Sequence, residues 1–206
     1  QAAENAAAHG ALRWRTRLVA LQCARQVLHL LRSTDDKGPH FDVTKGREAV
    51  TSALQKDGIT VENCPNFLSL HLEELVSMAC NAAAASSDDQ ELYTLQSTGV
   101  MLLQDVVSTF VRIPDPDADA GEGVLEQYQA QISSALRRAL TNSAACPELL
   151  SPACALLATG VQETLLCDLV MLKRSIKTLM TSPLHDVVTV PPSGNYGMAT
   201  DAQLHI

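Results

Sequence analysis

The sequence contains few aromatic residues and no long apolar run. Aromatic side chains make up 3% of the 206 residues, whereas β-sheets are enriched in aromatic and β-branched residues, so the composition argues against a sheet protein. No apolar run approaches the roughly 18 residues of a membrane-spanning helix. The N-terminal residues lack the basic and apolar segments of a signal peptide. We therefore expect no transmembrane segment and no secretion signal.

Positive charge is also scarce. Fifteen Lys and Arg stand against 23 Asp and Glu, which gives a formal net charge of −8. A protein that follows the phosphate backbone of a nucleic acid carries an excess of positive charge. The acidic balance therefore argues against nucleic acid as a partner.

Motifs that mark common enzymes and cofactor sites are absent from the sequence. There is no Gly-x-Ser-x-Gly nucleophile elbow and no Gly-x-x-x-x-Gly-Lys-Ser/Thr phosphate loop. Gly121-Glu122-Gly123 precedes an expected helix, but the acids around it would repel phosphate. The Cys-x-x-Cys and His-x-x-x-His spacings of zinc sites do not occur. The sequence thus predicts a non-enzymatic protein with no catalytic, cofactor-binding or metal-binding residues.

The acidic segment 115–126 leaves a metal site open as an alternative. It places acids at alternate positions from Asp115 and has Glu126 at its twelfth position, as an EF-hand calcium loop does. However, Pro116 lies inside the segment, and Ala120 stands where such a loop has glycine. An acidic linker is favoured over a weak calcium site.

The cysteines and histidines favour structural roles. Four of the six cysteines lie in apolar helical patterns, where we expect reduced core thiols: Cys23, Cys80, Cys154 and Cys167. His71 lies beside two glutamates, which is typical of a polar helix face, and His40 with Asp42 is a weak metal or acid–base hint in a loop. A cysteine–histidine nucleophilic pair stays open, because such partners meet in space and not in sequence.

Alanine and leucine dominate the composition, with 27 and 29 residues, and both have high helix propensity. Apolar residues recur every three to four positions, which predicts amphipathic helices. The expected helices span residues 12–33, 67–85, 89–110, 123–140, 148–161 and 164–180, with a shorter helix over 43–54. Short loops between helices imply antiparallel neighbours. The predicted fold is an all-α solenoid of stacked antiparallel helical hairpins, like HEAT or armadillo repeats, and a closed bundle is the alternative.

The same pattern predicts three regions. Residues 1–11 are a frayed end or the tail of a preceding helix, residues 12–181 are the helical-repeat segment, and residues 182–206 are an irregular tail rich in proline and glycine. Within the helices, Gly99 indicates close contact with a neighbouring helix, and Gly160 has the position of a helix C-cap.

Several stretches together resemble a known family. They are Arg13-Trp14-Arg15-Thr16-Arg17, His40-Phe41-Asp42, Phe67 to Ala79, Leu95-Gln96, Ile113-Pro114-Asp115-Pro116, Leu125 to Ile132, and Ala135-Leu136-Arg137. In order and approximate spacing, from residue 13 to about 180, they are similar to the HEAT repeat-containing protein 5 family. Residues 43–65, the acidic stretch after Pro116 and the tail from Ser182 depart from the family pattern.

The resemblance implies an internal segment of a long cytosolic HEAT-repeat protein without catalytic residues. It implies a protein-interaction scaffold for vesicle traffic at the trans-Golgi network and endosomes. Such a scaffold associates peripherally with membranes and clathrin-coated vesicles, through the clathrin adaptor complex and its accessory proteins. The alternatives are a helical-repeat scaffold of another cytosolic assembly, such as nuclear transport, and a small helical enzyme that uses cysteine or histidine chemistry. No partner-binding residue is assigned.

The residues that carry the resemblance also have structural interpretations. Trp14 lies on the apolar stripe of the first helix, so we expect it to pack within the protein rather than to contact a partner. We expect Arg13, Arg15 and Arg17 to be solvated or paired with acids of a neighbouring helix, rather than to bind an acidic motif or a lipid headgroup. We expect three polar side chains to bond across helices: Glu126, Gln127 and Gln129.

Overall fold

A computed structural model describes most of the chain. The described residues are 2–34, 39–56, 67–85, 90–118, 122–142, 147–166, 170, 172–174 and 176–177. All regular elements within these ranges are helices, and an isolated β-bridge joins Pro114 to Gly123. The predicted all-α fold is confirmed.

The elements follow one another along the chain as α-helices with short 3-10 turns (η). They are α1 (Ala2–Thr34), η1 (Pro39–Phe41), α2 (Val43–Lys56), η2 (Leu68–His71), α3 (Leu72–Ala83), α4 (Gln90–Phe110), η3 (Glu126–Tyr128), α5 (Gln129–Asn142) and α6 (Pro147–Gln162).

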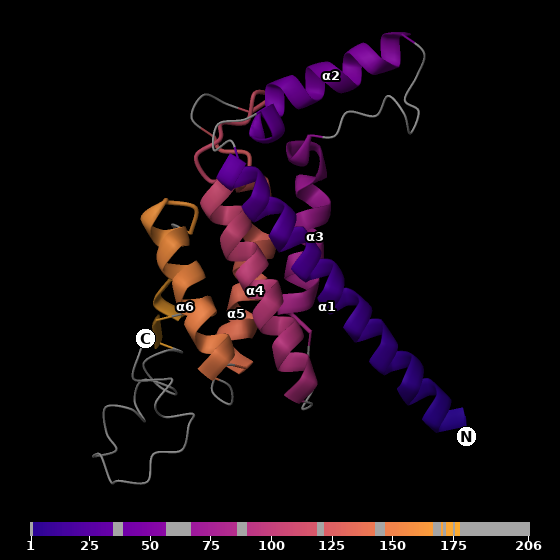
Figure 1. The fold of residues 1–206 in the computed structure, drawn as a ribbon. Helices are drawn as coiled ribbons and strands as arrows, with labels where there is room; N and C mark the ends of the chain where they lie inside the picture. Colours follow the sequence, from indigo (N-terminus) through magenta and orange to yellow (C-terminus); the bar gives the residue numbers. More distant parts are fainter. Residues whose placement is uncertain are drawn as a thin grey trace.

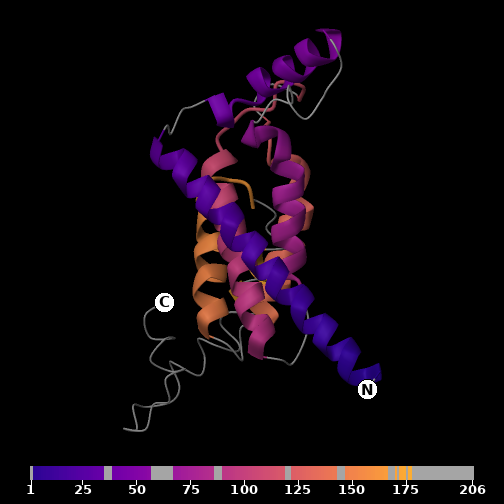
Figure 2. The same cartoon turned by 45° about the vertical axis from the view of Figure 1, so that its right-hand side comes forward.

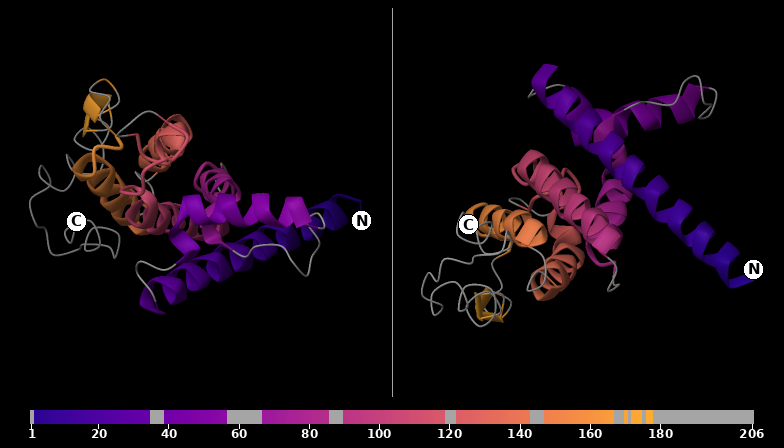
Figure 3. Two further views of the ribbon diagram at one scale, coloured as in Figure 1. Left: turned by 90° about the horizontal axis from the view of Figure 1, so that it is seen from above. Right: turned by 60° about the horizontal axis from the view of Figure 1, so that its bottom comes forward.

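The helices form two layers of stacked hairpins (Figure 1). Helices α3 and α4 make one hairpin and α5 and α6 the next, while α3 packs on α5 and α4 packs on α6. Helix α1 packs mainly on α4, so α1, α4 and α6 form one layer and α3 and α5 the other (Figures 2 and 3). The chain runs in one direction along α1, α4 and α6 and in the opposite direction along α3 and α5 (Figure 1). This arrangement is the predicted α-solenoid and not a closed bundle.

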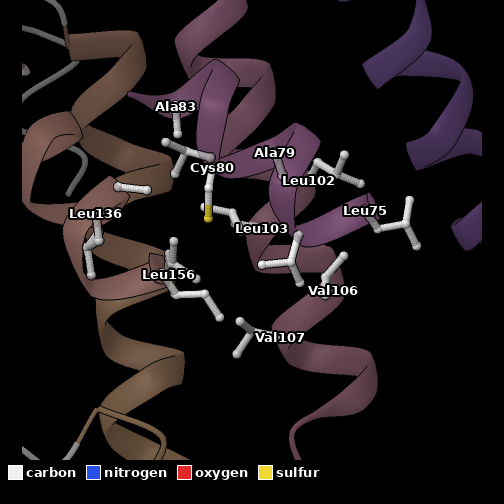
Figure 4. Close-up of a cluster of buried hydrophobic side chains, with 14 of the residues drawn as sticks. Leu75, Ala79, Cys80, Ala83, Leu102, Leu103, Val106, Val107, Leu136 and Leu156 are labelled. Carbon is white, nitrogen blue, oxygen red and sulfur yellow. The ribbon is translucent and has the colours of Figure 1, made fainter. Parts of the chain in front are cut away.

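The core lies where the two hairpins meet (Figure 4). Leu103 and Val107 of α4, Leu136 of α5 and Leu156 of α6 are all fully buried, and the Cys80 side chain of α3 lies among them. Full burial of one such side chain stabilises the fold by about 1.5–3 kcal/mol. Apolar packing between small and medium side chains therefore holds the layers together.

Gly99 lets α4 approach α3 closely, as predicted. A Cβ atom at this position would lie 2.6 Å from the Ala83 backbone nitrogen, 2.8 Å from the Ala82 Cβ and 2.9 Å from the Ala79 carbonyl oxygen. A side chain of any size would collide with these atoms, and two of them belong to the backbone.

Gly160 has a different role from the predicted C-cap. It lies inside α6, and an added Cβ would lie 2.5 Å from Leu166 Cδ1. The left-handed conformation expected of a C-cap occurs instead at Thr164, with φ 61°. After α6 the chain turns back, and the fully buried side chain of Leu166 packs directly against Gly160.

The first two helices differ in how well the pattern predicted their bounds. The break after the first helix is confirmed, since α1 ends at Thr34, but α1 begins at Ala2, so the helix continues through residues 2–11. Helix α2 begins at Val43 as predicted. The backbone N–H of Lys45 donates to Asp42 Oδ1 (3.0 Å), so Asp42 caps this helix. These interactions hold the pKa of Asp42 below its ordinary value, chiefly through the Lys45 backbone N–H.

Two predicted helices begin with a 3-10 turn. Helix α3 follows η2 and α5 follows η3, and neither Phe67 nor Leu125 provides a side-chain cap. Without a capping side chain, the first N–H groups of a helix are often satisfied by the tighter 3-10 pattern.

The last predicted helix lies partly outside the described residues. Leu165 and Leu166 are buried in a turn, and residues 170, 172–174 and 176–177 are helical. The tail from Ser182 lies outside the described residues, and the division into regions 1–11, 12–181 and 182–206 stays a prediction.

Candidate interaction surfaces

The inner face of α1 is fixed on α4 by apolar and polar contacts. Leu21 and Leu28 are buried. Next to them, Arg25 Nε donates to Asp105 Oδ2 (2.7 Å), and His29 Nε2 lies 3.3 Å from the same oxygen. The Asp105 side chain is 14% exposed, so this pair is better shielded from water than a surface ion pair. The contacts define which side of α1 faces the stack.

The opposite face of α1 is also apolar. Val19, Val27 and Leu30 are 57%, 48% and 61% exposed, and Cys23 between them is exposed too. The spacing of four, four and three residues places the four side chains on one stripe, turned away from Leu21 and Leu28. We call Val19, Cys23, Val27 and Leu30 the outer stripe. Helix α1 thus has two apolar faces, of which the stack covers one.

Trp14 packs as predicted. It is partly buried against the core, and the Arg15 guanidinium lies 5.5 Å from the centre of its ring, within the range of a cation–π contact. Arg13, Arg15 and Arg17 are exposed. Arg13 and Arg17, four residues apart, share one side of α1, and Arg15 lies on a different side.

The acidic linker holds α2. Arg47 of α2 forms ion pairs with Asp115 (3.3 Å) and Asp117, and Asp115 Oδ1 also accepts the backbone N–H of Asp117 (3.1 Å). A groove of about 470 Å³ lies between α2 and this turn. Two acids of the possible calcium loop are therefore partnered by a cation of the protein itself, which supports the interpretation as a linker. The described residues contain no cluster of three or more potential metal ligands.

Replacing Arg47 with alanine should loosen α2 without unfolding the stack. Among the described elements, α2 has substantial contacts with η1 and η2 only. Arg47 joins α2 to the 115–117 turn through its ion pairs. Because such partly exposed pairs contribute about 0–1 kcal/mol, global stability should fall by no more than about 1 kcal/mol. Limited trypsin digestion should cleave after Lys45 faster in Arg47→Ala than in the unchanged protein. The cleavage rate of Arg47→Lys should lie between the two. Unchanged cleavage would contradict the proposed link.

Glu126 and Gln127 bond locally, so the prediction of cross-helix hydrogen bonds is wrong for them. Glu126 Oε1 accepts the backbone N–H of Gly123 (3.0 Å), and Gln127 Nε2 donates to the Val124 carbonyl (3.2 Å). Both bonds lie at the start of η3, where local backbone groups need partners.

An ion pair lines a cavity at the end of the stack. Arg112 Nε and Nη2 donate to the two carboxylate oxygens of Glu163, at 2.7 and 2.6 Å. The pair lies at a cavity of about 230 Å³ that Thr164 also lines. The hydrogen bond from Arg112 holds the pKa of Glu163 below its ordinary 4.5 and raises that of Arg112.

The pH dependence of this pair gives a direct test. Because the folded state lowers the Glu163 pKa, its stabilisation is complete above pH 4.5 and is lost as the pH falls through the lower, folded pKa. An NMR titration of the Glu163 carboxyl carbon should give a midpoint below 4.5. In Arg112→Gln the midpoint should move back towards 4.5. A midpoint equal in both proteins would contradict the paired geometry.

The thiols divide into buried and exposed groups. Cys80 is buried, and burial raises its pKa to about 12. Cys154 is partly buried, and burial raises its pKa as well. Cys23 is exposed, so its prediction as a core thiol is wrong. The apolar pattern around it belongs to the outer stripe and not to the core. The other cysteines, Cys64, Cys146 and Cys167, lie outside the described residues.

Two of the described histidines, His40 and His71, lie in the 3-10 turns η1 and η2. His71 is exposed at the end of η2, as expected for a polar helix face. His40 lies 6.3 Å from Phe67, measured between ring centres. A buried thiol with a raised pKa is a poor nucleophile. Burial therefore makes Cys80 unsuited to nucleophilic attack.

Comparison with known proteins agrees with the architecture. A family model described as the Laa1/Sip1/HEATR5 HEAT repeat region matches residues 67–202. Protein SWEETIE of Arabidopsis thaliana is 34% identical over 180 residues, which cover 85% of this chain and 7% of SWEETIE. No solved structure matches the chain significantly.

Two layers of stacked helical hairpins with long open faces define a helical-repeat scaffold. The chain belongs to the Laa1/Sip1/HEATR5 family, within its HEAT repeat region. The resemblance to the HEAT repeat-containing protein 5 family is thus confirmed. The chain spans 7% of the length of SWEETIE.

The extent of the match corrects one expectation. The family model continues to residue 202, so the tail from Ser182 does not depart from the family pattern. The segment 43–65 lies outside the family match, as do α1 and α2. Residues 67–202 are about two-thirds of the chain, so the alignment with SWEETIE, which covers 85%, extends beyond them.

Among the described residues, no helix combines the length and the apolar character needed to cross a bilayer.

Proposed function

We propose that this chain is part of a non-enzymatic scaffold for clathrin-adaptor-linked vesicle traffic at the trans-Golgi network and endosomes. The observation that carries the proposal is the match of residues 67–202 to the Laa1/Sip1/HEATR5 HEAT repeat region. The scaffold works in the cytoplasm. It reaches the membrane through protein partners, namely the clathrin adaptor complex and its accessory proteins.

The architecture supports a scaffold rather than an enzyme. Stacked helical pairs present long faces to other proteins and enclose little space for a reaction. The buried thiol of Cys80, with its pKa of about 12, is protonated at neutral pH. It therefore lacks the activated thiolate that cysteine chemistry requires.

Affinity purification of the full natural polypeptide tests the proposal. The tagged protein, at its natural abundance, should enrich clathrin adaptor subunits and their accessory proteins over an unrelated HEAT-repeat protein that carries the same tag. Reproducible recovery of nuclear transport factors without adaptor components would instead favour the alternative assembly. Loss of the protein from trans-Golgi membranes after adaptor depletion is the expected companion result, and retention would contradict recruitment through the adaptor.

A further inference from the structure

Helix α6 contains a proline in its interior, and this proline interrupts the backbone hydrogen bonds of the helix. Pro152 lies in the second turn of α6, which begins at Pro147. Within an α-helix, each backbone N–H donates to the carbonyl oxygen four residues earlier. Proline has no N–H, and its ring crowds that carbonyl. The carbonyl of Glu148 therefore receives no hydrogen bond from position 152.

A side chain of another helix supplies a donor at this point. Ser97 Oγ of α4 donates to the Glu148 carbonyl oxygen (3.0 Å). Ser97 is 7% exposed and Pro152 is buried, so this hydrogen bond is shielded from water, where losing a donor is costly. The first turn of α6 is thus fastened to α4 by a directional bond, in place of a bond within the helix.

Beyond Pro152, α6 meets its neighbours through apolar surface. Ala153, Leu156 and Leu157 are buried, and Leu156 lies among side chains of α4 and α5 (Figure 4). Apolar contacts are not directional, and helices packed in this way can slide past each other by small amounts. The two parts of α6 are therefore held to the stack in different ways, and Pro152 separates them.

We propose that Pro152 makes a joint in α6 and that Ser97 is the latch of this joint. When the hydrogen bond from Ser97 to the Glu148 carbonyl opens, the part of α6 beyond Pro152 pivots relative to α4. A pivot in one helix of a stack changes the angle to the next hairpin, so the joint adjusts the local curvature of the scaffold. Ser97 acts through the Glu148 carbonyl and is a positioning residue. The inference rests on the hydrogen bonds of α4 and α6 and not on the proposed role in traffic.

Hydrogen–deuterium exchange in the full natural polypeptide tests the latch. The measurement compares backbone amides in the segment 149–157, which spans the joint, with those in the segment 130–140 of α5. Ser97→Ala should speed exchange in 149–157 about tenfold, because a buried carbonyl that loses its donor favours the open state. The rate in 130–140 should stay unchanged. Ser97→Cys should give an intermediate rate, since a thiol is a weak donor.

Pro152→Ala separates the latch from a general effect on packing. Alanine provides an N–H four residues after Glu148, and a carbonyl oxygen can accept two hydrogen bonds. The carbonyl then keeps a donor when Ser97 loses its hydroxyl. In the Pro152→Ala protein, Ser97→Ala should therefore change exchange in 149–157 by less than about twofold.

Thr98→Val is the matched control for Ser97→Ala. Thr98 is also 7% exposed, but its Oγ1 donates to the Thr94 carbonyl (2.8 Å) within α4 itself. That carbonyl keeps its ordinary helical partner, the backbone N–H of Thr98, when the hydroxyl is removed. Exchange in both segments should be the same as in the unchanged protein.

Other results would overturn the inference. An equal effect of Ser97→Ala with and without Pro152 would mean that the hydroxyl does not act through the Glu148 carbonyl. Faster exchange in 149–157 and 130–140 alike would mean that the bond stabilises the whole stack and not a joint. Unchanged exchange in Ser97→Ala would mean that no latch operates. None of these results bears on adaptor recovery, so failure of this inference is distinguishable from failure of the proposed function.

Discussion

Phe110→Ala is expected to lower the free energy of unfolding by about 3–5 kcal/mol, the range for deleting a buried aromatic side chain. Phe110 is fully buried at the end of α4. Its ring meets Phe41 edge-on, with centroids 5.8 Å apart and planes at 69°. The substitution would leave a cavity and also remove an aromatic pair that contributes about 0.5–1.5 kcal/mol. Urea unfolding followed by circular dichroism at 222 nm measures the change.

Two companion variants make this result interpretable. Phe110→Leu keeps most of the volume and should cost less than alanine, so it serves if the alanine variant does not fold. Phe41→Leu removes the ring pair while the Phe110 side chain stays in the core. A double-mutant cycle with both positions should give a coupling of about 0.5–1.5 kcal/mol. Zero coupling would show that η1 is not docked on α4 through these rings.

Gly99→Ala is expected to destabilise the protein by about 2 kcal/mol, although alanine is the better helix former. In an isolated helix the change would gain about 1 kcal/mol. Here the new Cβ would lie 2.6 Å from the Ala83 nitrogen and 2.9 Å from the Ala79 oxygen, and overpacking against atoms that cannot rotate away costs about 1–3 kcal/mol or more. The same urea titration reports the sign.

Gly46→Ala is the matched control for Gly99. Gly46 also lies inside a helix, but its nearest neighbours would be side chains, Ser69 Oγ at 3.0 Å and Leu70 Cδ2 at 3.3 Å. These groups can shift by a few tenths of an ångström, so the change in stability should stay within about 1 kcal/mol. If Gly99→Ala stabilised the protein by as much as Gly46→Ala, close helix contact would not explain the glycine in α4.

Local sequence patterns predicted the positions of most helices well. They did not predict which face of a helix packs against which neighbour. The three- to four-residue recurrence of apolar residues gave the positions of α3, α4, α5 and α6, because burial in a helix repeats with the helical turn. The same recurrence in α1 reflects two faces, and periodicity alone does not separate the side that meets α4 from the outer stripe. For this reason the pattern predicts Cys23 in the core, whereas the structure leaves it exposed.

The candidate surfaces depended on contacts between distant parts of the sequence. Arg25 meets Asp105, Arg47 meets Asp115 and Asp117, and Arg112 meets Glu163. Nothing in the local sequence of these residues specifies their partners, since each pair joins separate elements. The sequence of the acidic linker therefore resembles a calcium loop, whereas in the structure Arg47 pairs with two of its acids.

The sequence by itself determined the class of this protein. Abundant alanine and leucine, few aromatic residues and short loops suffice for paired helices, because helix propensity and periodic burial are local properties. The motifs of the sequence were also sufficient to identify its family. The tertiary structure decided what depends on packing: the order of the two layers, the close contact at Gly99, the role of Gly160, and the face of α1 that is left open. These features are set by which helices meet, and a linear pattern does not contain that information.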